Sequence, residues 1–463
     1  MENKFWEYFK EICKIPRESG NEENIANYIV NFAKERNLEY YKDSLNNVIV
    51  YKKATDAERE NETICLQGHI DMVCQKAKGS NHDFEKDPIE IIVEENIVKA
   101  KDTTLGADNG IGLSYILTIL DSNEIKHPNL ECIFTVEEET TMKGALSLDY
   151  TKIKSKRIIS IDNEEEDKIS IGSMGIREYW AEKNIEYTSV FNKENFKAFT
   201  LEFFNFKGGH SGIDIGDKER VNPIKLFADS FKNLEIYIEN LECGSRPNAI
   251  PVECKIDFVI ANKDIDKLNN IISDLKSKEI HGNVSIEKKE LPEKAITKEN
   301  SLEILNVVNE YKNGVLASED GKPLLTSNFA ILKKEEDKVK IVVSFRNSVV
   351  NLAKEYTNYV KRIFNAYNFS LFYIDEYPAY EAKETNHLIS TAVEIYEKMY
   401  GKKIVPAPVN GALECGAFSD KIDNLEFIAV GPNIYNAHSI DEYVEIDSAN
   451  KMYNYVVNLI ENI

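Results

Sequence analysis

The sequence lacks the features that would tie the chain to a membrane or to a nucleic acid. No segment reaches the ~18–20 uninterrupted apolar residues that a membrane-spanning helix needs. The N-terminal stretch MENKFWEYFKEICKIP is charged and amphipathic, without the apolar core of a signal peptide. Lys and Arg number 57 against 79 Asp and Glu, and a net charge of −22 argues against phosphate backbones as partners. We therefore predict no membrane and no nucleic-acid partner.

Cysteine is also sparse, which bears on the compartment. The chain has 7 cysteines in 463 residues, an odd number without a short-range pairing pattern. Such usage suits a reducing cytoplasm better than a disulfide framework. With 42% hydrophobic and 29% charged residues, the composition is that of an ordinary soluble globular protein of two or three domains. We therefore expect a cytoplasmic protein of two domains.

Residues 1–183 alternate between helical and extended patterns. A helix near residues 3–13 precedes a second helix in SGNEENIANYIVNFAKERN, where Ser19 is placed to cap the helix and Glu22 to complete a capping box. GIGLSYILTILDS predicts a further helix. Four apolar stretches predict strands: NVIVYKK, TICLQGHI, NLECIFTVEE and KRIISIDNEE. This alternation predicts an α/β fold with a mostly parallel, doubly wound sheet.

The pattern changes at about residue 184. FKAFTLEFFNFKGGHSG is a long alternating strand with a Gly-rich end, typical of an antiparallel sheet. KIDFVIANKDIDKLNNIISDLKS and KIVVSFRNSVVNLAKEYTNYVKRIF both read strand then helix, and another strand follows each. An internal duplication and a coincidence of ordinary patterns both remain open. The simplest architecture is a catalytic domain, 1–183 and 378–463, interrupted by an inserted α+β antiparallel lid domain, 184–377.

Polar residues gather where the predicted strands end. His69 and Asp71 follow a buried strand and, two residues apart on an extended segment, face the same side. Comparable positions are held by Asp108 in TTLGADNGIG, Glu137–Glu139, Asp162 in IISIDNEEED and His438 in YNAHSIDE. Because loops beyond the carboxyl ends of parallel strands converge, two histidines and three carboxylates here predict a site for two Zn²⁺-like ions.

Each of these elements also has a plainer interpretation. A lone histidine such as His69 is more often a satisfied core residue, and an acidic run such as Glu137–Glu139 is usually a solvated face. GADNGIG suits a plain turn before a helix or a phosphate loop, although it lacks the Lys and Ser/Thr of a P-loop and the dinucleotide fingerprint. The joint order of the elements along the chain favours the metal site.

Eight motifs strengthen that interpretation: GHIDMV, TTLGADNGIG, EEETTMKGA, SIDNEEED, KGGHSG, RPNAIP, ALECGAF and AHSIDE. On these motifs, which span residues 68–442, the sequence resembles the aminoacyl-histidine dipeptidase (Xaa-His dipeptidase, carnosinase-type) family of dinuclear zinc metallopeptidases. The resemblance implies a hydrolase with two Zn²⁺ per chain, or Co²⁺ or Mn²⁺ in their place. Thr141 and the loop 172–178 depart from the family pattern without touching an implied ligand, and their effect on specificity stays open.

The resemblance also implies a role for each clustered residue. The implied metal ligands are His69, Asp108, Glu139, Asp162 and His438. Asp108 would bridge both ions, with a cis peptide bond to Asn109; His69 and Asp162 would complete one ion and Glu139 and His438 the other. Glu138 would be the general base, and Asp71 would orient the His69 imidazole and raise its basicity.

Four further residues are candidates for substrate contacts. The resemblance assigns His210 in KGGHSG to the oxyanion of the tetrahedral intermediate, where the plainer interpretation is a turn histidine. Arg346 in VVSFRNS is our candidate for the substrate carboxylate, because a guanidinium binds carboxylates in a bidentate manner; a surface salt bridge is its alternative. Asn248 in RPNAIP is expected to assist, and Glu414 in ALECGAF to hold the free α-amine.

The sequence thus predicts a metal-dependent dipeptidase that hydrolyses Xaa-His substrates such as carnosine and other short dipeptides. One alternative is an amidohydrolase that deacylates N-acyl amino acids; another is a catalytically silent metal-binding homologue, which the presence of Glu138 disfavours. The expected partner is a small peptide, and the chain is expected to be a monomer or a homodimer. Because the apparent duplication enlarges the insertion, we expect one chain to supply both His210 and Arg346.

Overall fold

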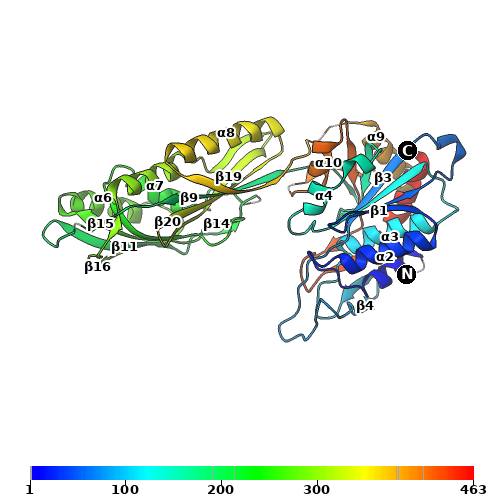
Figure 1. The fold of residues 1–463 in the computed structure, drawn as a ribbon, viewed down its shortest axis with the longest axis horizontal. Coiled ribbons are helices and arrows are strands. Elements are labelled where there is room, and N and C mark those ends of the chain that lie inside the picture. The colour runs from blue at the N-terminus through cyan, green and yellow to red at the C-terminus, as the bar shows by residue number, and fades with distance from the viewer. Residues whose placement is uncertain (1–2, 190, 213, 382, 384, 410) are drawn as a thin grey trace. The chain divides into compact units, whose positions relative to one another are not determined.

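The computed structural model describes residues 3–189, 191–212, 214–381, 383, 385–409 and 411–463. The chain divides into two compact units (Figure 1). The first comprises residues 1–173, 382–409 and 413–463, and the second comprises residues 174–381 and 410–412. The chain therefore leaves the first unit, builds the second and returns, as expected for an inserted domain.

The first unit contains a mixed sheet that is parallel at its centre. β3 pairs in parallel with β6 and β7, and β7 with β23. Residues of β3 are buried from Ile64 to His69, as expected for a central strand covered on both faces. In spatial order the strands are β1 (Glu39–Lys42), β2 (Val48–Lys52), β6 (Asn129–Thr135), β3 (Thr63–His69), β7 (Arg157–Ser160), β23 (Glu426–Ala429), β8 (Lys168–Ser173) and β22 (Val405–Val409).

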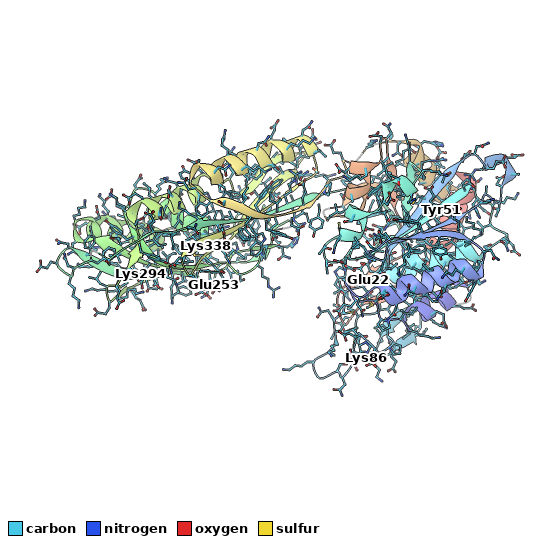
Figure 2. The ribbon with its side chains drawn as sticks, viewed as in Figure 1. Glu22, Tyr51, Lys86, Glu253, Lys294 and Lys338 are labelled. Carbon is cyan, nitrogen blue, oxygen red and sulfur yellow. A yellow bond between two sulfur atoms is a disulfide. The ribbon has the colours of Figure 1, made fainter. Side chains whose placement is uncertain are left out.

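Helices of the first unit share one apolar core with this sheet. They are α1 (Phe5–Ile12), α2 (Glu23–Glu35), α3 (Ala107–Asp121), α9 (His387–Tyr400) and α11 (Ile446–Asn462). α3 is apolar on nearly all sides and buried, because α1, α11 and β3 all pack against it. The short helices α4 (Lys143–Ser147) and α10 (Cys415–Lys421) pack together. Tyr51, which Figure 2 labels, lies on β2, next to the edge strand β1. Its hydroxyl donates to the Lys152 carbonyl at 2.9 Å.

A smaller antiparallel sheet joins segments that lie far apart in the sequence. It consists of β24 (Ile434–Tyr435), β25 (Tyr443–Glu445), β5 (Ile97–Ala100) and β4 (Ile91–Glu94). This pairing brings the C-terminal segment that contains His438 beside the segment that leads into α3. It thereby brings two of the sequence motifs onto one side of the first unit.

The second unit contains an antiparallel sheet whose strand order is symmetrical. In spatial order it reads β16 (Asn283–Lys289), β11 (Phe196–Phe204), β15 (Cys254–Ala261), β13 (Tyr237–Cys243), β19 (Lys322–Glu335), β20 (Lys338–Asn347), β9 (Gly175–Asn184) and β21 (Ser370–Tyr377), with β18 (Gly314–Glu319) paired to β19. The helices are α5 (Pro223–Phe231), α6 (Ile265–Ser277), α7 (Lys298–Glu310) and α8 (Val350–Ala366). They share an apolar core with the sheet.

Each half of this sheet has the same connectivity. The first half runs β11, α5, β13, β15, α6, β16, and the second runs β9, α7, β19, β20, α8, β21. The halves meet where β13 pairs with β19, and corresponding strands then follow outward in the same order. This topology is the one that a duplicated βαββαβ unit produces. β9 contributes to the second half although it precedes the first in the chain.

Three observations differ from the sequence analysis. Ser19 does not cap α2: the helix starts at Glu23, and the Ser19 hydroxyl donates to Asp71 Oδ2 at 2.7 Å instead. The inserted unit begins at Met174 rather than at 184, because β9 pairs with β20 and β21. Cys243 and Cys254 form a disulfide, because strand register sets them opposite each other.

Within the described residues, no helix combines the length and the apolar character needed to cross a membrane.

Candidate active site

The site in the first unit is built where parallel strands end. His69 is the last residue of β3 and lies opposite Thr135, the last residue of β6. The chain continues from β6 into Glu138 and Glu139, and from β7 into Asp162. Because these strands are parallel and adjacent, their carboxyl ends deliver these side chains to one edge of the sheet.

Asp108 lies between two imidazoles. Its Oδ1 is 3.0 Å from His69 Nε2, and its Oδ2 is 3.5 Å from His438 Nε2. Asp108 belongs to the first turn of α3, and its peptide bond to Asn109 is cis, as the resemblance implies. One carboxylate therefore presents one oxygen to each of two imidazole nitrogens, which is the arrangement that a bridging ligand requires.

Each imidazole has a second carboxylate beside it. His69 Nε2 is 3.5 Å from Asp162 Oδ1, and His438 Nε2 is 2.9 Å from Glu139 Oε2. These contacts divide the predicted ligands into the two sets that the resemblance implies. Nitrogen and oxygen atoms of these side chains lie within 4.8 Å of one another in three groups, which are His69, Asp108 and Asp162; His69, Glu138 and Glu139; and Asp108, Glu139 and His438.

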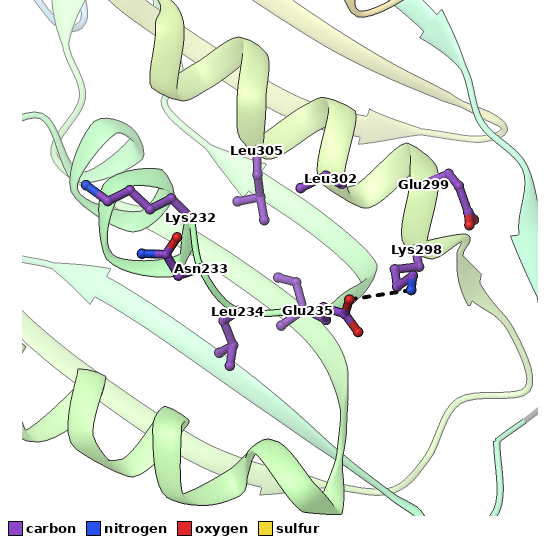
Figure 3. A pocket seen from close by; sticks show the side chains of 9 residues that line it. Lys232, Asn233, Leu234, Glu235, Lys298, Glu299, Leu302 and Leu305 are labelled. Atoms are coloured by element: carbon purple, nitrogen blue, oxygen red, sulfur yellow. Dashed lines mark hydrogen bonds and ion pairs between the residues drawn. The ribbon is translucent and has the colours of Figure 1, made fainter.

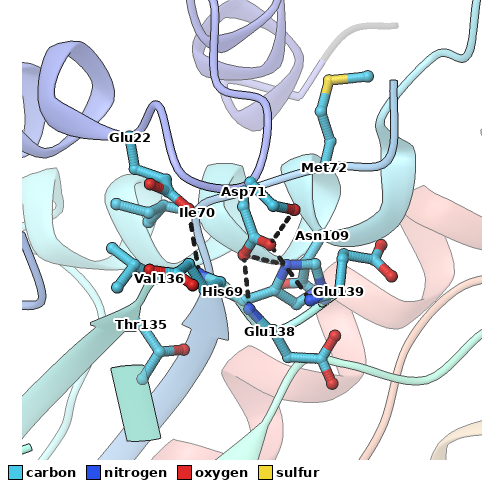
Figure 4. A network of polar contacts seen from close by, with 12 residues as sticks. Glu22, His69, Ile70, Asp71, Met72, Asn109, Thr135, Val136, Glu138 and Glu139 are labelled. Atoms are coloured by element: carbon cyan, nitrogen blue, oxygen red, sulfur yellow. Dashed lines mark hydrogen bonds and ion pairs between the residues drawn. The ribbon is translucent and has the colours of Figure 1, made fainter. Parts of the chain in front are cut away.

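Asp71 contacts His69 and the loop that carries Glu138 and Glu139 (Figure 4). Its Oδ1 is 3.3 Å from His69 Nδ1, so Nε2 is the nitrogen left to face Asp108. The same carboxylate accepts the backbone N–H groups of Glu138 at 3.1 Å and Glu139 at 3.2 Å. Asp71 and His69 are both fully buried. One buried carboxylate thus fixes the imidazole and the loop that follows β6.

The acids of the site shift one another's proton affinities. Burial opposes ionisation of Asp108, but hydrogen bonds from His438 and His69 hold its pKa well below the usual range. Hydrogen bonds to Asp108 and Glu139 raise the pKa of His438 to about 11. Burial is the main cause that raises the pKa of Glu138 well above its ordinary value, with nearby acids adding to it. Glu138 therefore holds a proton more readily than an exposed glutamate.

The donor atoms fit divalent metal ions. Carboxylate oxygens and imidazole nitrogens are the ligands that Zn²⁺ and similar ions take, and the carboxylates here outnumber the imidazoles. Without cations, so many buried acids would repel one another. The chemistry of the donor set therefore suits two cations, one beside His69 and Asp162 and one beside Glu139 and His438.

Two positioning residues were not identified from the sequence. The buried Glu442 carboxylate accepts the backbone N–H groups of Leu105, Gly106 and Ala107 at 2.8–2.9 Å, which fixes the turn before Asp108. Glu442 lies in the motif AHSIDE, so its position four residues after His438 was a signal that could have been used.

The second is Arg17, which is also buried. Its guanidinium donates to the backbone carbonyls of Ile70, Asp71 and Gly106. It thus joins the segment after β3 to the turn before α3. No local pattern around Arg17 indicates this role, because its acceptors are main-chain atoms far away in the sequence.

Glu414 lies beneath the strand ends. Its Oε2 accepts hydrogen bonds from Gln67 Nε2 and, at 2.7 Å, from Thr135 Oγ1. Glu414 is 2% exposed, and burial raises its pKa to about 8. Its Oε1 has no hydrogen-bond partner among the described residues. The residue therefore sits in the floor of the site with one oxygen uncommitted.

The remaining candidates belong to the second unit. The Arg346 guanidinium donates to His210 Nε2 at 3.1 Å, and burial followed by the Arg346 charge lowers the pKa of His210. Arg346 is buried, so it is not a surface salt bridge, and no carboxylate of the described residues forms an ion pair with it. Asn248 is exposed, and its carbonyl accepts the Ser211 N–H at 2.9 Å. These three residues thus form a second cluster.

The second unit also has a cavity of about 370 Å³ at a different place (Figure 3). Leu234, Leu302 and Leu305 give it an apolar lining, and Lys298 and Glu235 form an ion pair of 3.5 Å beside it. The residues that line this cavity include none of the predicted site residues.

The chain is similar to known peptidases. The model of the family described as peptidase family M20/M25/M40 matches residues 65–462. The cytosol non-specific dipeptidase of Escherichia coli is 27% identical over 474 aligned positions, which cover 99% of this chain and 97% of that protein.

Solved structures of similar proteins are also found. Aminoacylhistidine dipeptidase from Vibrio alginolyticus has a TM-score of 0.87 and 29% identity, covering 99% of this chain and 96% of that one. A tripeptidase from Staphylococcus aureus has a TM-score of 0.58 and 14% identity, covering 99% and 97%, and is similar in fold alone.

Proposed function

The chain belongs to peptidase family M20/M25/M40, and from this premise we propose that it is a metal-dependent dipeptidase. Its substrates are short dipeptides with a free amine, Xaa-His peptides such as carnosine among them. The observation that carries the proposal is Asp108, whose two oxygens face the imidazoles of His69 and His438. The similarity to an aminoacylhistidine dipeptidase and to a non-specific dipeptidase supports the substrate class.

The proposed ligands are His69, Asp108 and Asp162 for one ion and Asp108, Glu139 and His438 for the other. Bound there, two Zn²⁺ ions, or Co²⁺ or Mn²⁺, supply Lewis-acid activation of a water molecule and of the scissile carbonyl. Asp71 holds His69 through Nδ1, which keeps Nε2 available as a donor atom.

Glu138 is the proposed general base. A carboxylate oxygen of Glu138 takes a proton from the attacking water and returns it to the nitrogen of the leaving amine. Burial raises the pKa of Glu138, so its carboxylate accepts a proton more readily than an exposed glutamate does, which suits a group that takes up a proton and returns it. It is adjacent to the ligand Glu139 but is not required as a ligand.

The substrate contacts are proposed from side-chain chemistry. His210 donates to the developing oxyanion, and Arg346 binds the substrate carboxylate with help from Asn248. The buried Arg346 guanidinium, without a carboxylate partner among the described residues, supports the second role. Glu414 holds the free α-amine, which its uncommitted Oε1 supports.

A panel of substrates tests the proposal. We expect the purified chain, loaded with Zn²⁺, Co²⁺ or Mn²⁺, to hydrolyse free-amine dipeptides and to lose this activity after chelation. N-acetyl amino acids serve as the competing substrate class. Faster hydrolysis of N-acetyl amino acids than of dipeptides would contradict the proposal and identify a deacylase. Failure to hydrolyse either class with metal bound would identify a silent homologue.

We further propose that one chain, in the cytoplasm, supplies the complete set of residues, whether it is a monomer or a homodimer. The printed name of the cytosolic relative supports the compartment. The duplicated topology of the second unit supports the single-chain arrangement, because both His210 and Arg346 lie on it. Mixing a Glu138→Ala chain with a His210→Ala chain is then expected to restore no activity, and recovery on mixing would show that His210 acts across subunits.

A further inference from the structure

The hairpin loop 244–253 joins β13 to β15 and carries Asn248. Within it, β14 (Ala249–Ile250) pairs with β12 (Gly209–His210), so that His210 lies opposite Ala249. The base of the loop is closed by a hydrogen bond from the Gly244 N–H to the Glu253 carbonyl at 3.2 Å. The Ser211 N–H donates to the Asn248 carbonyl of this loop at 2.9 Å, whereas the His210 N–H donates to Asp214 Oδ2 at 2.8 Å. The loop therefore holds the strand segment that carries His210, and displacement of the loop displaces that segment.

Side chains from the other half of the sheet hold the loop in turn. On β19, Asn328 Nδ2 donates to the Ala249 carbonyl at 2.8 Å. On β20, the Ser344 hydroxyl donates to the Pro247 carbonyl at 3.3 Å. Asn328 and Ser344 are register partners on adjacent strands, so their side chains share one face of the sheet. Arg346, two residues after Ser344, reaches the His210 side chain from the same face.

These contacts matter because the two halves share little main-chain pairing. β13 and β19 are paired only at Glu242 with Lys333 and at Cys243 with Leu332, within the described strands. The loop beyond Cys243 is then connected to the second half by side chains. Asn328 supplies the shortest of these hydrogen bonds and reaches the residue directly opposite His210.

Asn328 is a buried polar residue whose side chain is only partly hydrogen-bonded. Asn328 is 1% exposed, and its Oδ1 has no hydrogen-bond partner among the described residues. A buried amide oxygen without a partner lowers stability, whereas an apolar side chain at this position would not incur that cost. The hydrogen bond from Nδ2 to Ala249 is therefore what the asparagine contributes here.

We propose that Asn328 is a positioning residue that holds His210 through the loop 244–253. This inference rests on the proposed function of His210 at the oxyanion. Because a group that binds the oxyanion acts in the transition state, misplacing it lowers kcat more than it raises KM.

Asn328→Ala tests the proposal, with Asn309→Ala as the matched control. Asn309 Nδ2 also donates to a backbone carbonyl of the second unit, that of Ala228 at 3.0 Å, but on a different element. For Asn328→Ala we expect amide hydrogen exchange in peptides covering 208–211 and 246–251 to be about 5-fold faster or more, the effect of losing one buried hydrogen bond. The control should leave these peptides at the wild-type rate.

Kinetics in two backgrounds separate positioning from general destabilisation. We expect Asn328→Ala to lower kcat on a dipeptide by about 10-fold with KM changed less than about 2-fold. In the His210→Ala background the same substitution should cause no further loss, because residues that act through one group are non-additive. An additive loss, or an equal loss in Asn309→Ala, would overturn the proposal.

A second variant and the hydrogen-exchange measurement keep the test decisive. If Asn328→Ala does not fold, Asn328→Ser replaces it, because serine retains a donor on a shorter side chain. We then expect the same changes in hydrogen exchange and in kcat, each smaller than for alanine. If the wild-type chain hydrolyses no dipeptide, the proposed function fails, but hydrogen exchange still decides whether Asn328 holds the loop. Unchanged exchange at 208–211 and 246–251 in a folded variant would overturn the inference even if the chain is an active dipeptidase.

Discussion

The two units gather charges of opposite kinds. In the first unit, carboxylates cluster around His69 and His438, and Asp108 contacts both imidazoles. In the second unit, Arg346 lies beside His210, and no carboxylate of the described residues pairs with its guanidinium. An excess of buried acids is stabilised by cations, whereas a buried guanidinium is stabilised by an anion. This difference supports the proposed metal site in the first unit and the proposed contact between Arg346 and the substrate carboxylate in the second.

The largest effect is expected at the proposed base. Glu138→Ala should lower kcat by about 100- to 10,000-fold, because it removes proton transfer. Metal content, measured by plasma mass spectrometry, should stay near the wild-type value, since the base is not required as a ligand. Loss of both ions in this variant would mean that the roles of Glu138 and Glu139 are exchanged.

Asp108→Asn tests whether the carboxylate excess holds cations. A neutral amide cannot bridge two cations as a carboxylate does, so affinity for both ions should fall together, by more than the ~10–100-fold that loss of a supporting residue costs. Titration calorimetry with Zn²⁺ on chelator-treated protein measures this. Asn109→Ala is a poor control because Asn109 contacts Asp162, whereas Asn129→Ala leaves the site untouched. Selective loss of a single ion would contradict the bridging role.

Arg346→Ala tests the anion site in the second unit. Removing a charge-assisted hydrogen bond should raise KM for a dipeptide by about 10- to 150-fold. A dipeptide with an amidated C-terminus should be hydrolysed equally poorly by both proteins, because it lacks the carboxylate. If the substitution affected the amidated substrate as strongly as the free acid, Arg346 would act on something other than the carboxylate.

The smallest effect concerns stability without metal. The pKa of Glu414 is about 8 in the folded chain against an ordinary value of 4.5, so the folded state binds more protons between these values. Stability of chelator-treated protein should therefore be fullest below pH 4.5 and fall as the pH rises towards 8. Thermal unfolding across this range should show a shallower decline for Glu414→Gln. An identical decline in both proteins would mean that Glu414 does not titrate in this window.

Much of the fold was predictable because its patterns are local. Alternating strands and helices predicted the parallel sheet, and apolar strands followed by His69 and Asp162 predicted that these side chains would meet. The contributions of Ser19 and Arg17 could not be predicted, because their partners, Asp71 and distant carbonyls, are set by tertiary packing. The disulfide between Cys243 and Cys254 could not be predicted for the same reason. The register of β13 and β15 sets the two cysteines opposite each other, and the spacing of the cysteines in the sequence does not reveal that register.

The duplicated sheet of the second unit also allows its two halves to carry different functional residues. Aligning KIDFVIANK with KIVVSFRNS matches Ile256 with Ile341 and Ile260 with Phe345, all in the core, and sets Ala261 against Arg346. In a symmetric pair of identical subunits every substitution occurs in both copies. Here each half varies alone, so one half can keep the histidine and the other the guanidinium without duplicating either charge.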